Sequence, residues 1–269
     1  MKNTLLTLAL IFGGLCNTQA QTQILTLDDS RDLTPVINAA AEKGGKYNIR
    51  FGSRVVVIDD WDVLCLPFDV TPAQLSNAFG YAVIARLVEE SDDGNIHFEV
   101  TVSGSIPAGT PFLLNVGDTY KTKDNFRKVV SFTGVTVKAV EASTTVSDAS
   151  GNRFISTFSP VALHDSKVLY LSEGVWNSAG NFSEEEPFTL KPLRCYFDFS
   201  GNTTVERPQV VIDDAGITSI IEVAGLNGEA SDRKGSQYNG WYTLTGTRLT
   251  EAPTTKGIYI HQGRKVIIR

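Results

Sequence analysis

Residues 59–71 read DDWDVLCLPFDVT, a run of strand-forming residues set between aspartates. In an extended chain Val63 and Cys65 point to one face, and the opposite face carries Leu64, Leu66 and Phe68. Because both faces are apolar, the segment predicts a strand that lies centrally in a sheet and is covered on each side. Pro67 cannot donate a backbone hydrogen bond, so it is expected to mark the end of that strand.

The aspartates of this stretch are expected to flank the buried strand rather than to fill it. Asp59 and Asp60 have the character of turn residues before the strand, and Asp69 follows its end. The alternative is an acid pair in a glycan-acting hydrolase, which would require two carboxylates about 5 to 10 Å apart in a cleft. The spacing does not indicate such a pair, so no catalytic residue is assigned and the chain is not predicted to be an enzyme.

The rest of the chain also favours strands with one buried face. In LRCYFDF the apolar positions Leu193, Cys195, Phe197 and Phe199 alternate with Arg194, Tyr196 and Asp198. Further strands are predicted at Asn95–Val102, Phe112–Val116, Val135–Val140 and Lys167–Ser172. Many short strands separated by Gly, Pro, Asn and Asp turns predict an all-β fold with a β-sandwich-like domain.

One or two short helices are expected within this domain. In TPAQLSNAFG (71–80), Thr71 can cap a helix, Pro72 suits its first position, Gln74 completes a capping box and Gly80 ends it. The segment from Thr34 to Gly45 carries similar start and stop signals around a run of alanines.

The first residues predict export. Residues 1–20 combine Lys2, an apolar run and small residues before a cleavage site between Ala20 and Gln21, which is the pattern of a secretory signal peptide. Lipidation of Cys16 is the alternative, although the leucine before it is a poor substitute for the small residue such a site needs. No other apolar run approaches the ~18 residues that cross a bilayer, so no transmembrane segment is predicted in the mature chain. The expected location is the cell surface, the extracellular space or the periplasm.

The mature chain is predicted to have three parts: a sandwich-like module over 21–200, a linker over 201–240 and a small C-terminal β-domain over 241–269. The linker is inferred from the polar, glycine-rich run at 225–240, and it contains one strand-like segment, GITSIIEV (216–223). The C-terminal part has short strands, the last two joined at Gln262-Gly263 as in a tight hairpin.

Charge argues against a nucleic-acid partner. The chain has 24 Lys and Arg against 30 Asp and Glu, a net charge of −6. A surface that binds phosphates needs clustered basic residues, which this sequence lacks. No cofactor is indicated. The histidines His97, His164 and His261 are dispersed, and Glu184–Glu186 lacks the spacing of a calcium loop, so no metal site is predicted.

Two kinds of residue are candidates for a site. An exposed aromatic ring can serve as an apolar platform for a sugar, and Trp176, in the Gly, Ser and Asn-rich stretch SEGVWNSAGN, is the first candidate, with Tyr120 second. The alternative for Trp176 is that it folds back and closes one end of the sandwich. Cys65 and Cys195 would be permitted to pair as a disulfide in an oxidising compartment, or each would serve as a small buried hydrophobe.

Several motifs in order resemble an exported β-rich module common in Bacteroidetes, whose typical members carry W-x-T-L-C-L-P-F and A-G-T-P-[YF]. Here the corresponding stretches are WDVLCLPFDVT (61–71), SIPAGTPFLL (105–114), RFISTFSP (153–160), KVLYLS (167–172) and LRCYFDF (193–199). Val63 stands where threonine is usual, and Cys195 where alanine is usual. The resemblance implies a secreted or surface module, often suspected of adhesion or polysaccharide handling, and it supplies no catalytic residue.

The C-terminal part resembles the terminal β-domains of Bacteroidetes exported proteins, through YTLTGTRL (242–249) and KGIYIHQGRKVIIR (256–269). In some relatives such domains are sorting signals that an outer-membrane secretion machine reads and removes. A small β-appendage that stays attached is the alternative.

These observations favour a non-enzymatic exported module that binds a glycan or a host or cell-surface protein, as an adhesin does. The alternative, from another class, is a structural or assembly subunit of the cell surface whose strands pair with other copies. The hydrolase is the third hypothesis. The ligand and the oligomeric state are left open.

Overall fold

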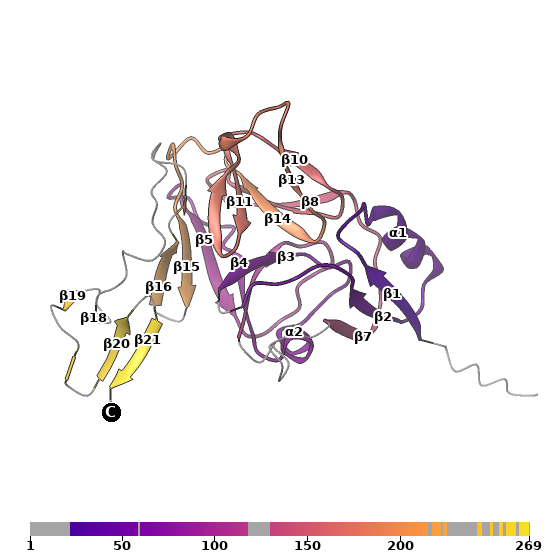
Figure 1. The fold of residues 1–269 in the computed structure, drawn as a ribbon, viewed down its shortest axis with the longest axis horizontal. Helices are drawn as coiled ribbons and strands as arrows, with labels where there is room; N and C mark the ends of the chain where they lie inside the picture. Colours follow the sequence, from indigo (N-terminus) through magenta and orange to yellow (C-terminus); the bar gives the residue numbers. More distant parts are fainter. Residues whose placement is uncertain are drawn as a thin grey trace, which may run out of the picture.

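The protein is a β-sandwich in a computed structural model that describes residues 22–58, 60–117 and 130–214, with short segments at 217–221, 223–224, 241–243, 248–249, 253–254, 257–261 and 264–268. Two six-stranded sheets form the sandwich, and a three-stranded sheet with helix α1 lies at one end of it (Figure 1). The prediction of an all-β, sandwich-like fold with two short helices is confirmed.

The first sheet has the strand order β16-β15-β5-β4-β6-β3. Its strands are β3 (Trp61–Leu64), β4 (Ala82–Leu87), β5 (Ile96–Thr101), β6 (Phe112–Val116), β15 (Val210–Asp214) and β16 (Ile217–Ile221). Its neighbours pair antiparallel except β15 and β5, which are parallel. A segment from the end of the chain thus completes a sheet begun near its start.

The second sheet has the order β17-β12-β11-β14-β9-β8. Its strands are β8 (Ser143–Ser147), β9 (Arg153–Thr157), β11 (Val168–Ser172), β12 (Val175–Ser178), β14 (Arg194–Asp198) and β17 (Val223–Ala224). A two-stranded sheet of β10 (Val161–Leu163) and β13 (Phe188–Leu190) supplies apolar side chains that pack with Val168 and Tyr170 of β11. The second sheet therefore carries apolar residues on both faces.

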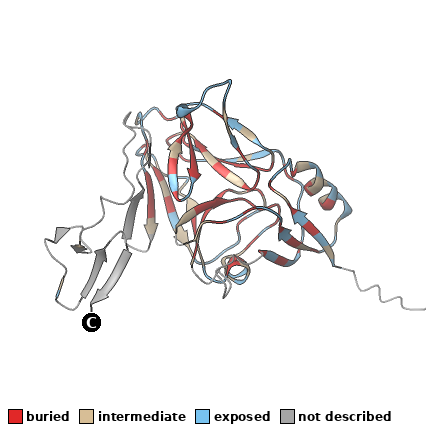
Figure 2. Cartoon of the chain, in the orientation of Figure 1, coloured by how far each residue is buried: buried red, intermediate tan, exposed pale blue. Residues whose placement is uncertain are grey.

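Aromatic rings fill the space between the two large sheets. The Phe98 ring of β5 packs edge-on against Phe154 of β9, with 5.4 Å between ring centroids, and Phe154 stacks on Phe197 of β14 at 4.5 Å. The alternation predicted for LRCYFDF is confirmed, because its apolar positions are all buried. Figure 2 shows this buried layer between the sheets. Burial of apolar surface contributes about 25 cal/mol of folding free energy per Å², so this aromatic layer is the main stabilising element of the fold.

The N-terminal layer begins with a parallel pair joined by a helix. Strands β1 (Gln23–Leu27) and β2 (Tyr47–Phe51) are parallel, and α1 (Thr34–Lys43) connects them; β7 (Ser131–Val135) adds antiparallel to β2. The helix predicted between Thr34 and Gly45 is thus confirmed. Its inner face buries Ile37 and Ala40, and Tyr47 Oη donates a hydrogen bond of 3.1 Å to the Ala40 carbonyl.

The prediction for the strand at Val63 is right about its burial and wrong about its position in the sheet. Residues 63–66 are buried, so both faces of the strand are covered, but β3 pairs only with β6 and forms the edge of its sheet. The strand was expected to be central because two apolar faces are typical of such strands. Here β11 and β14 of the second sheet pack against this edge strand, and the Arg54 side chain donates to its Val63 carbonyl.

The strand predicted at Val135–Val140 is wrong beyond its first residue. Only Val135 belongs to β7, although Val137 and Val140 are buried. The backbone of this segment bonds outside any ladder: Lys138 N donates to the Pro67 carbonyl at 2.8 Å, and Val140 N donates to Asn38 Oδ1 at 2.8 Å. Alternating valines therefore mark burial here without strand pairing.

The predicted domain end at Ser200 is also corrected. Strand β15 lies within the expected linker, and Val210, Val211 and Ile212 are buried in the sandwich. The sandwich therefore extends past the proposed boundary, because β5 would otherwise expose its outer edge. The glycine-rich run at 225–240 lies outside the described residues.

The C-terminal strands form a four-stranded sheet of order β19-β18-β20-β21. Its strands are β18 (Trp241–Thr243), β19 (Arg248–Leu249), β20 (Gly257–His261) and β21 (Arg264–Ile268). The last two strands pair antiparallel, with His261 opposite Arg264, while the turn predicted at Gln262-Gly263 lies outside the described residues.

Helix α2 (Pro72–Phe79) begins with the predicted capping box. Thr71 Oγ1 accepts a hydrogen bond from Gln74 N, and the Gln74 side chain accepts one from Thr71 N. Replacement Thr71→Ala removes the first of these bonds and is expected to lower the free energy of unfolding by about 1 kcal/mol in urea denaturation. Thr71→Ser is the matched control, and it should retain most of the stability. Equal losses in the two variants would contradict the capping role.

Candidate functional site

The candidate site is a pocket of roughly 210 Å³ at one end of the second sheet. The register pairs Leu169 with Ser178 and Val168 with Asp198, so the start of β11 and the ends of β12 and β14 lie side by side. The pocket is lined by Ser166, Lys167, Ser178, Gly180, Asn181, Phe199, Glu206 and Arg207. Hydroxyls, one amide and three charged side chains dominate its wall.

Close backbone packing shapes the pocket. A Cβ atom at Gly180 would lie 2.8 Å from Ser166 Cα, so only glycine fits at this position. Ser178 caps the short helix η2 (Ala179–Asn181), because its Oγ accepts a hydrogen bond of 3.2 Å from Gly180 N. The same Oγ donates to the Ser166 carbonyl at 3.4 Å. These contacts hold the two walls of the pocket together.

Lys167 is the central cation of the pocket. Its Nζ lies 5.3 Å from the centroid of the buried Phe199 ring and donates a hydrogen bond of 3.2 Å to the Glu206 carbonyl. The backbone around it is also tied down, since Phe199 N donates to the Lys167 carbonyl at 3.0 Å. With Arg207 also in the lining, the pocket presents two cations and the Glu206 side chain beside hydroxyl groups. Such a wall suits oxygen-rich and anionic groups.

The expectation of an exposed ring at Trp176 is wrong. The ring is fully buried and packs against Phe197, with 5.1 Å between ring centroids. The alternative holds, because the inward face of β12 places the indole between the two large sheets. A large apolar ring gains more free energy there than on the surface.

An aromatic group that the sequence analysis did not predict is formed by residues close to the pocket residues along the sequence. Tyr170 stacks on Phe188 at 4.0 Å, and Phe182 packs against Phe188 at 5.5 Å. Phe182, which directly follows the pocket residue Asn181, keeps 36% of its surface exposed. Burial raises the pKa of the Tyr170 hydroxyl. The only signal for this group was that its members flank the Gly, Ser and Asn-rich segment that contains Trp176.

The aspartates of residues 59–71 divide between surface and core. Asp69 is an exposed partner of Lys138 at 2.7 Å, and Asp60 accepts a hydrogen bond of 2.8 Å from the Trp61 backbone. Asp62 departs from the expected flanking role, because it lies within β3 and is buried. Asp59 lies outside the described residues.

Asp62 belongs to a cluster that we call the buried charge cluster: the buried side chains of Asp29, Arg54 and Asp62, with the partly exposed Arg194 and the exposed Ser53 at its margin. Arg54 Nη2 donates to Asp62 Oδ1 at 2.8 Å and to the Val63 carbonyl at 2.7 Å, while Asp62 Oδ2 accepts from the backbone N of Val57 at 3.0 Å. Arg194 Nη1 donates to Asp29 Oδ2 at 2.6 Å, and the Ser53 hydroxyl donates to Asp29 Oδ1. The carboxylates are thus paired with guanidinium groups, not with a second acid.

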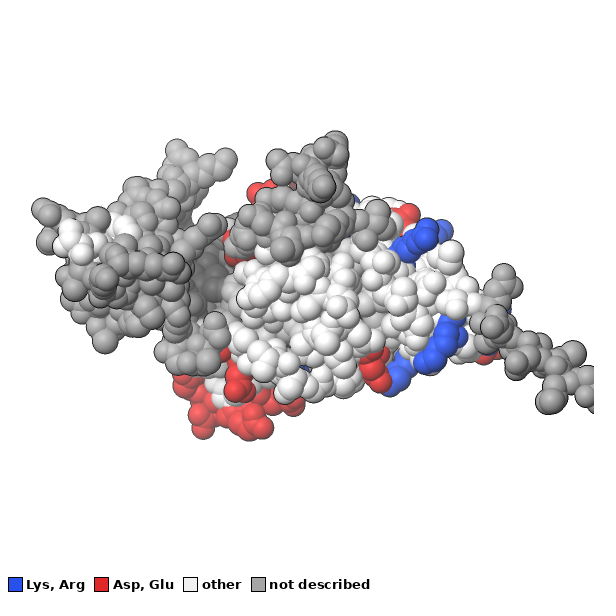
Figure 3. All heavy atoms as spheres, turned by 90° about the horizontal axis from the view of Figure 1, so that it is seen from below, with Lys and Arg blue, Asp and Glu red and all other residues white. Residues whose placement is uncertain are grey.

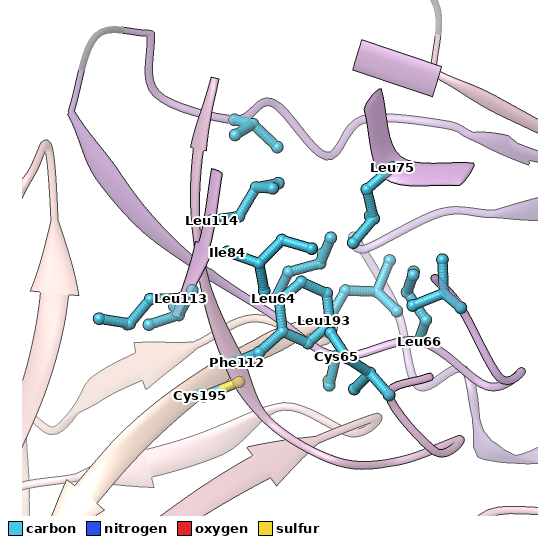
Figure 4. Close-up of a cluster of buried hydrophobic side chains, with 14 of the residues drawn as sticks. Leu64, Cys65, Leu66, Leu75, Ile84, Phe112, Leu113, Leu114, Leu193 and Cys195 are labelled. Atoms are coloured by element: carbon cyan, nitrogen blue, oxygen red, sulfur yellow. The ribbon is translucent and has the colours of Figure 1, made fainter. Parts of the chain in front are cut away.

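Cys65 and Cys195 come together between the two sheets (Figure 4). Both are fully buried free thiols, so the predicted disulfide is not formed in this structure. Burial raises the pKa of the Cys195 thiol, and its contact with the Cys65 thiol raises it further. Here the two cysteines serve as small core residues, which was the alternative.

The remaining predicted positions do not converge. His97 lies in β5 beside Asp93, with 3.0 Å between Nε2 and Oδ2, while His164 and Glu184–Glu186 are exposed. Among the residues that the structure describes, no three His, Cys, Asp or Glu side chains form a group that would hold a metal ion. Tyr120 and the cleavage residues Ala20 and Gln21 lie outside the described residues.

No helix in the described part of the chain is long and apolar enough to cross a membrane. Comparison with known proteins adds no relative: no family model, no curated protein and no solved structure matches the chain.

The buried pair of Arg54 and Asp62 predicts a large effect of removing one partner. In Asp62→Ala the guanidinium would stay buried without its carboxylate, which is expected to cost about 3 to 5 kcal/mol of unfolding free energy in urea denaturation. Lys138→Ala removes an exposed ion pair and serves as the control, with an expected loss below about 1 kcal/mol. Similar losses in the two variants would show that Asp62 is not a structural partner.

The second carboxylate of the buried charge cluster predicts acid sensitivity. Burial acts to raise the pKa of Asp29, but hydrogen bonds from Ser53 and Arg194 outweigh it and hold that pKa below its ordinary value of 3.8. Because the folded pKa is depressed, the stabilisation is complete above the unfolded value and is lost as pH falls through 3.8 and below. Urea unfolding at about pH 6 and about pH 3 should show a smaller loss in Asp29→Asn than in the wild type. If Asp29→Asn lost as much unfolding free energy between the two pH values as the wild type does, Asp29 would not be a source of the acid sensitivity.

Proposed function

We propose that this protein is an exported, non-enzymatic surface or periplasmic module that binds a glycan. The single observation that supports it best is the pocket lined by Lys167, Arg207 and the hydroxyls of Ser166 and Ser178. Sites for small polar ligands are concave and use a few convergent polar groups to fix orientation. Hydroxyls match the hydroxyl groups of a sugar, and the two cations favour a carboxylate or sulfate on it. The proposed ligand is therefore an acidic glycan.

The neighbouring aromatic group supports a sugar rather than a free anion. Phe182 is partly exposed and follows directly on Asn181 of the pocket wall. An apolar ring beside polar groups is the usual arrangement for a pyranose, whose C–H face packs on the ring while its hydroxyls reach the polar side chains. Phe182 takes the place that the sequence assigned to Trp176.

The charge distribution is consistent with a localised site. On the face in Figure 3, acidic side chains gather towards one end and basic ones towards the other, with a broad, sparsely charged area between them. That face lacks the continuous basic stripe by which proteins hold nucleic acid. Recognition of one acidic group in a small pocket needs no such stripe.

A glycan array probed with the purified full chain tests this function. Binding to uronate-bearing or sulfated glycans is expected, and Lys167→Met and Arg207→Ala should each weaken it roughly 10- to 100-fold, because each removes a charge-assisted hydrogen bond. Methionine keeps an apolar stem over Phe199 while the ammonium group is lost. Raising the salt concentration should also weaken glycan binding by the wild type, because salt screens the charges.

The matched control is Lys191→Ala, which removes an exposed cation away from the pocket and should leave binding unchanged. Phe182→Ala should reduce binding of the sugar but leave any affinity for free sulfate unaltered. Absence of binding to every acidic glycan, or equal binding by wild type and both pocket variants, would refute the proposal.

A further inference from the structure

Cys65 and Cys195 are two buried thiols that have no role in the proposed glycan binding. Cys65 follows β3 of the first sheet, and Cys195 lies in β14 of the second. Cys65 Sγ lies 3.6 Å from the Thr157 carbonyl and 3.7 Å from that of Arg194, the residue directly before Cys195. Thr157 and Arg194 are paired across β9 and β14, so the Cys65 thiol lies beside the stretch of β14 that contains Cys195. The described residues contain no other cysteine.

We propose that these two cysteines are an oxidation site at which an inter-sheet disulfide forms. The geometry favours it, because a disulfide requires two side chains that meet with little backbone movement, and Cys65 Sγ already lies 3.7 Å from the carbonyl of Arg194, which precedes Cys195 in β14. The chain supplies only one further cysteine, Cys16, within the predicted signal peptide. The inference does not depend on the glycan pocket, and the oxidising compartments in which such bonds persist agree with the proposed export.

The reaction is a thiol–disulfide exchange with a small or protein disulfide as the oxidant. One thiolate attacks the external disulfide and releases one thiol; the second thiolate then attacks the mixed disulfide and releases the other. The new S–S bond thus replaces two S–H bonds of the protein, and the oxidant takes up two electrons and two protons. Both sulfurs are fully buried once the sheets close, so the exchange is expected before folding is complete.

Burial also predicts how the bond behaves afterwards. A reductant cannot reach a fully enclosed bond in the folded protein, so reduction should require denaturant. The bond would join segments that are far apart in the sequence, which restricts the unfolded chain strongly. Its expected effect is an upward shift of the melting temperature of roughly 10 °C relative to the reduced protein.

The test uses the full chain carrying Cys16→Ser, so that only the two core cysteines remain. The protein is unfolded, then refolded with either oxidised glutathione or dithiothreitol, and free thiols are alkylated in denaturant before tryptic digestion and mass spectrometry. After oxidative refolding, a peptide containing Cys65 linked to one containing Cys195 is expected. Melting curves should show the higher transition only in the oxidised sample, and phosphine without denaturant should not abolish it.

Cys195→Ala is the matched variant, because alanine fills this position with little loss of core volume. It should fold and melt at one temperature under both refolding conditions. The proposal is overturned if both cysteines remain alkylatable or carry glutathione after oxidative refolding, or if the linked protein melts no higher than the reduced one. The oxidised and reduced samples of the Cys16→Ser chain decide the outcome even if the Cys195→Ala variant does not fold.

Discussion

The structure depends on how strand β3, at the edge of the first sheet, is held with only one of its own edges in a ladder. Its other edge meets the Arg54 side chain, which donates to the Val63 carbonyl and pairs with Asp62. Asp62 in turn accepts from the backbone of Val57. A buried polar group without a partner costs about 1 to 3 kcal/mol, so an uncovered edge here would be expensive. The Arg54–Asp62 pair thus supplies hydrogen bonds at this edge of β3 in place of a neighbouring strand.

The same cluster connects the N-terminal layer to the sandwich. Asp29, which follows β1, accepts a hydrogen bond from Arg194 at the start of β14, and Ser53, which follows β2, donates to Asp29. The hydrophobic effect drives these layers together but is not directional. Hydrogen-bonded charges have a definite geometry, so they select one arrangement among those that bury similar apolar area. The aromatic core supplies most of the free energy, and the buried charge cluster specifies the packing.

The candidate pocket is a consequence of strand order. Lys167 and Ser178 border one hairpin, while Arg207 comes from the loop before β15, and these segments meet only because β15 returns to the first sheet. None of the three stood out in the sequence, because a lysine before a strand or a serine after one is usually solvated surface. The Gly, Ser and Asn-rich stretch singled out in the sequence does contain the pocket residues Ser178, Gly180 and Asn181. Its tryptophan is not exposed, because Trp176 lies on an inward-facing position of β12.

Local patterns in the sequence determined much of this protein: the alternation in LRCYFDF, the capping box at Thr71 and the helix after Thr34 all follow from geometry within a few residues. The tertiary structure alone decided that β3 is an edge strand, that Asp62 pairs with Arg54 and that Cys65 meets Cys195. Period-two alternation reports which face of a strand is buried, but it does not report which strand lies beside it or how an edge is covered. Those choices are made by contacts between segments far apart in the chain, where packing and the pairing of buried polar groups act together.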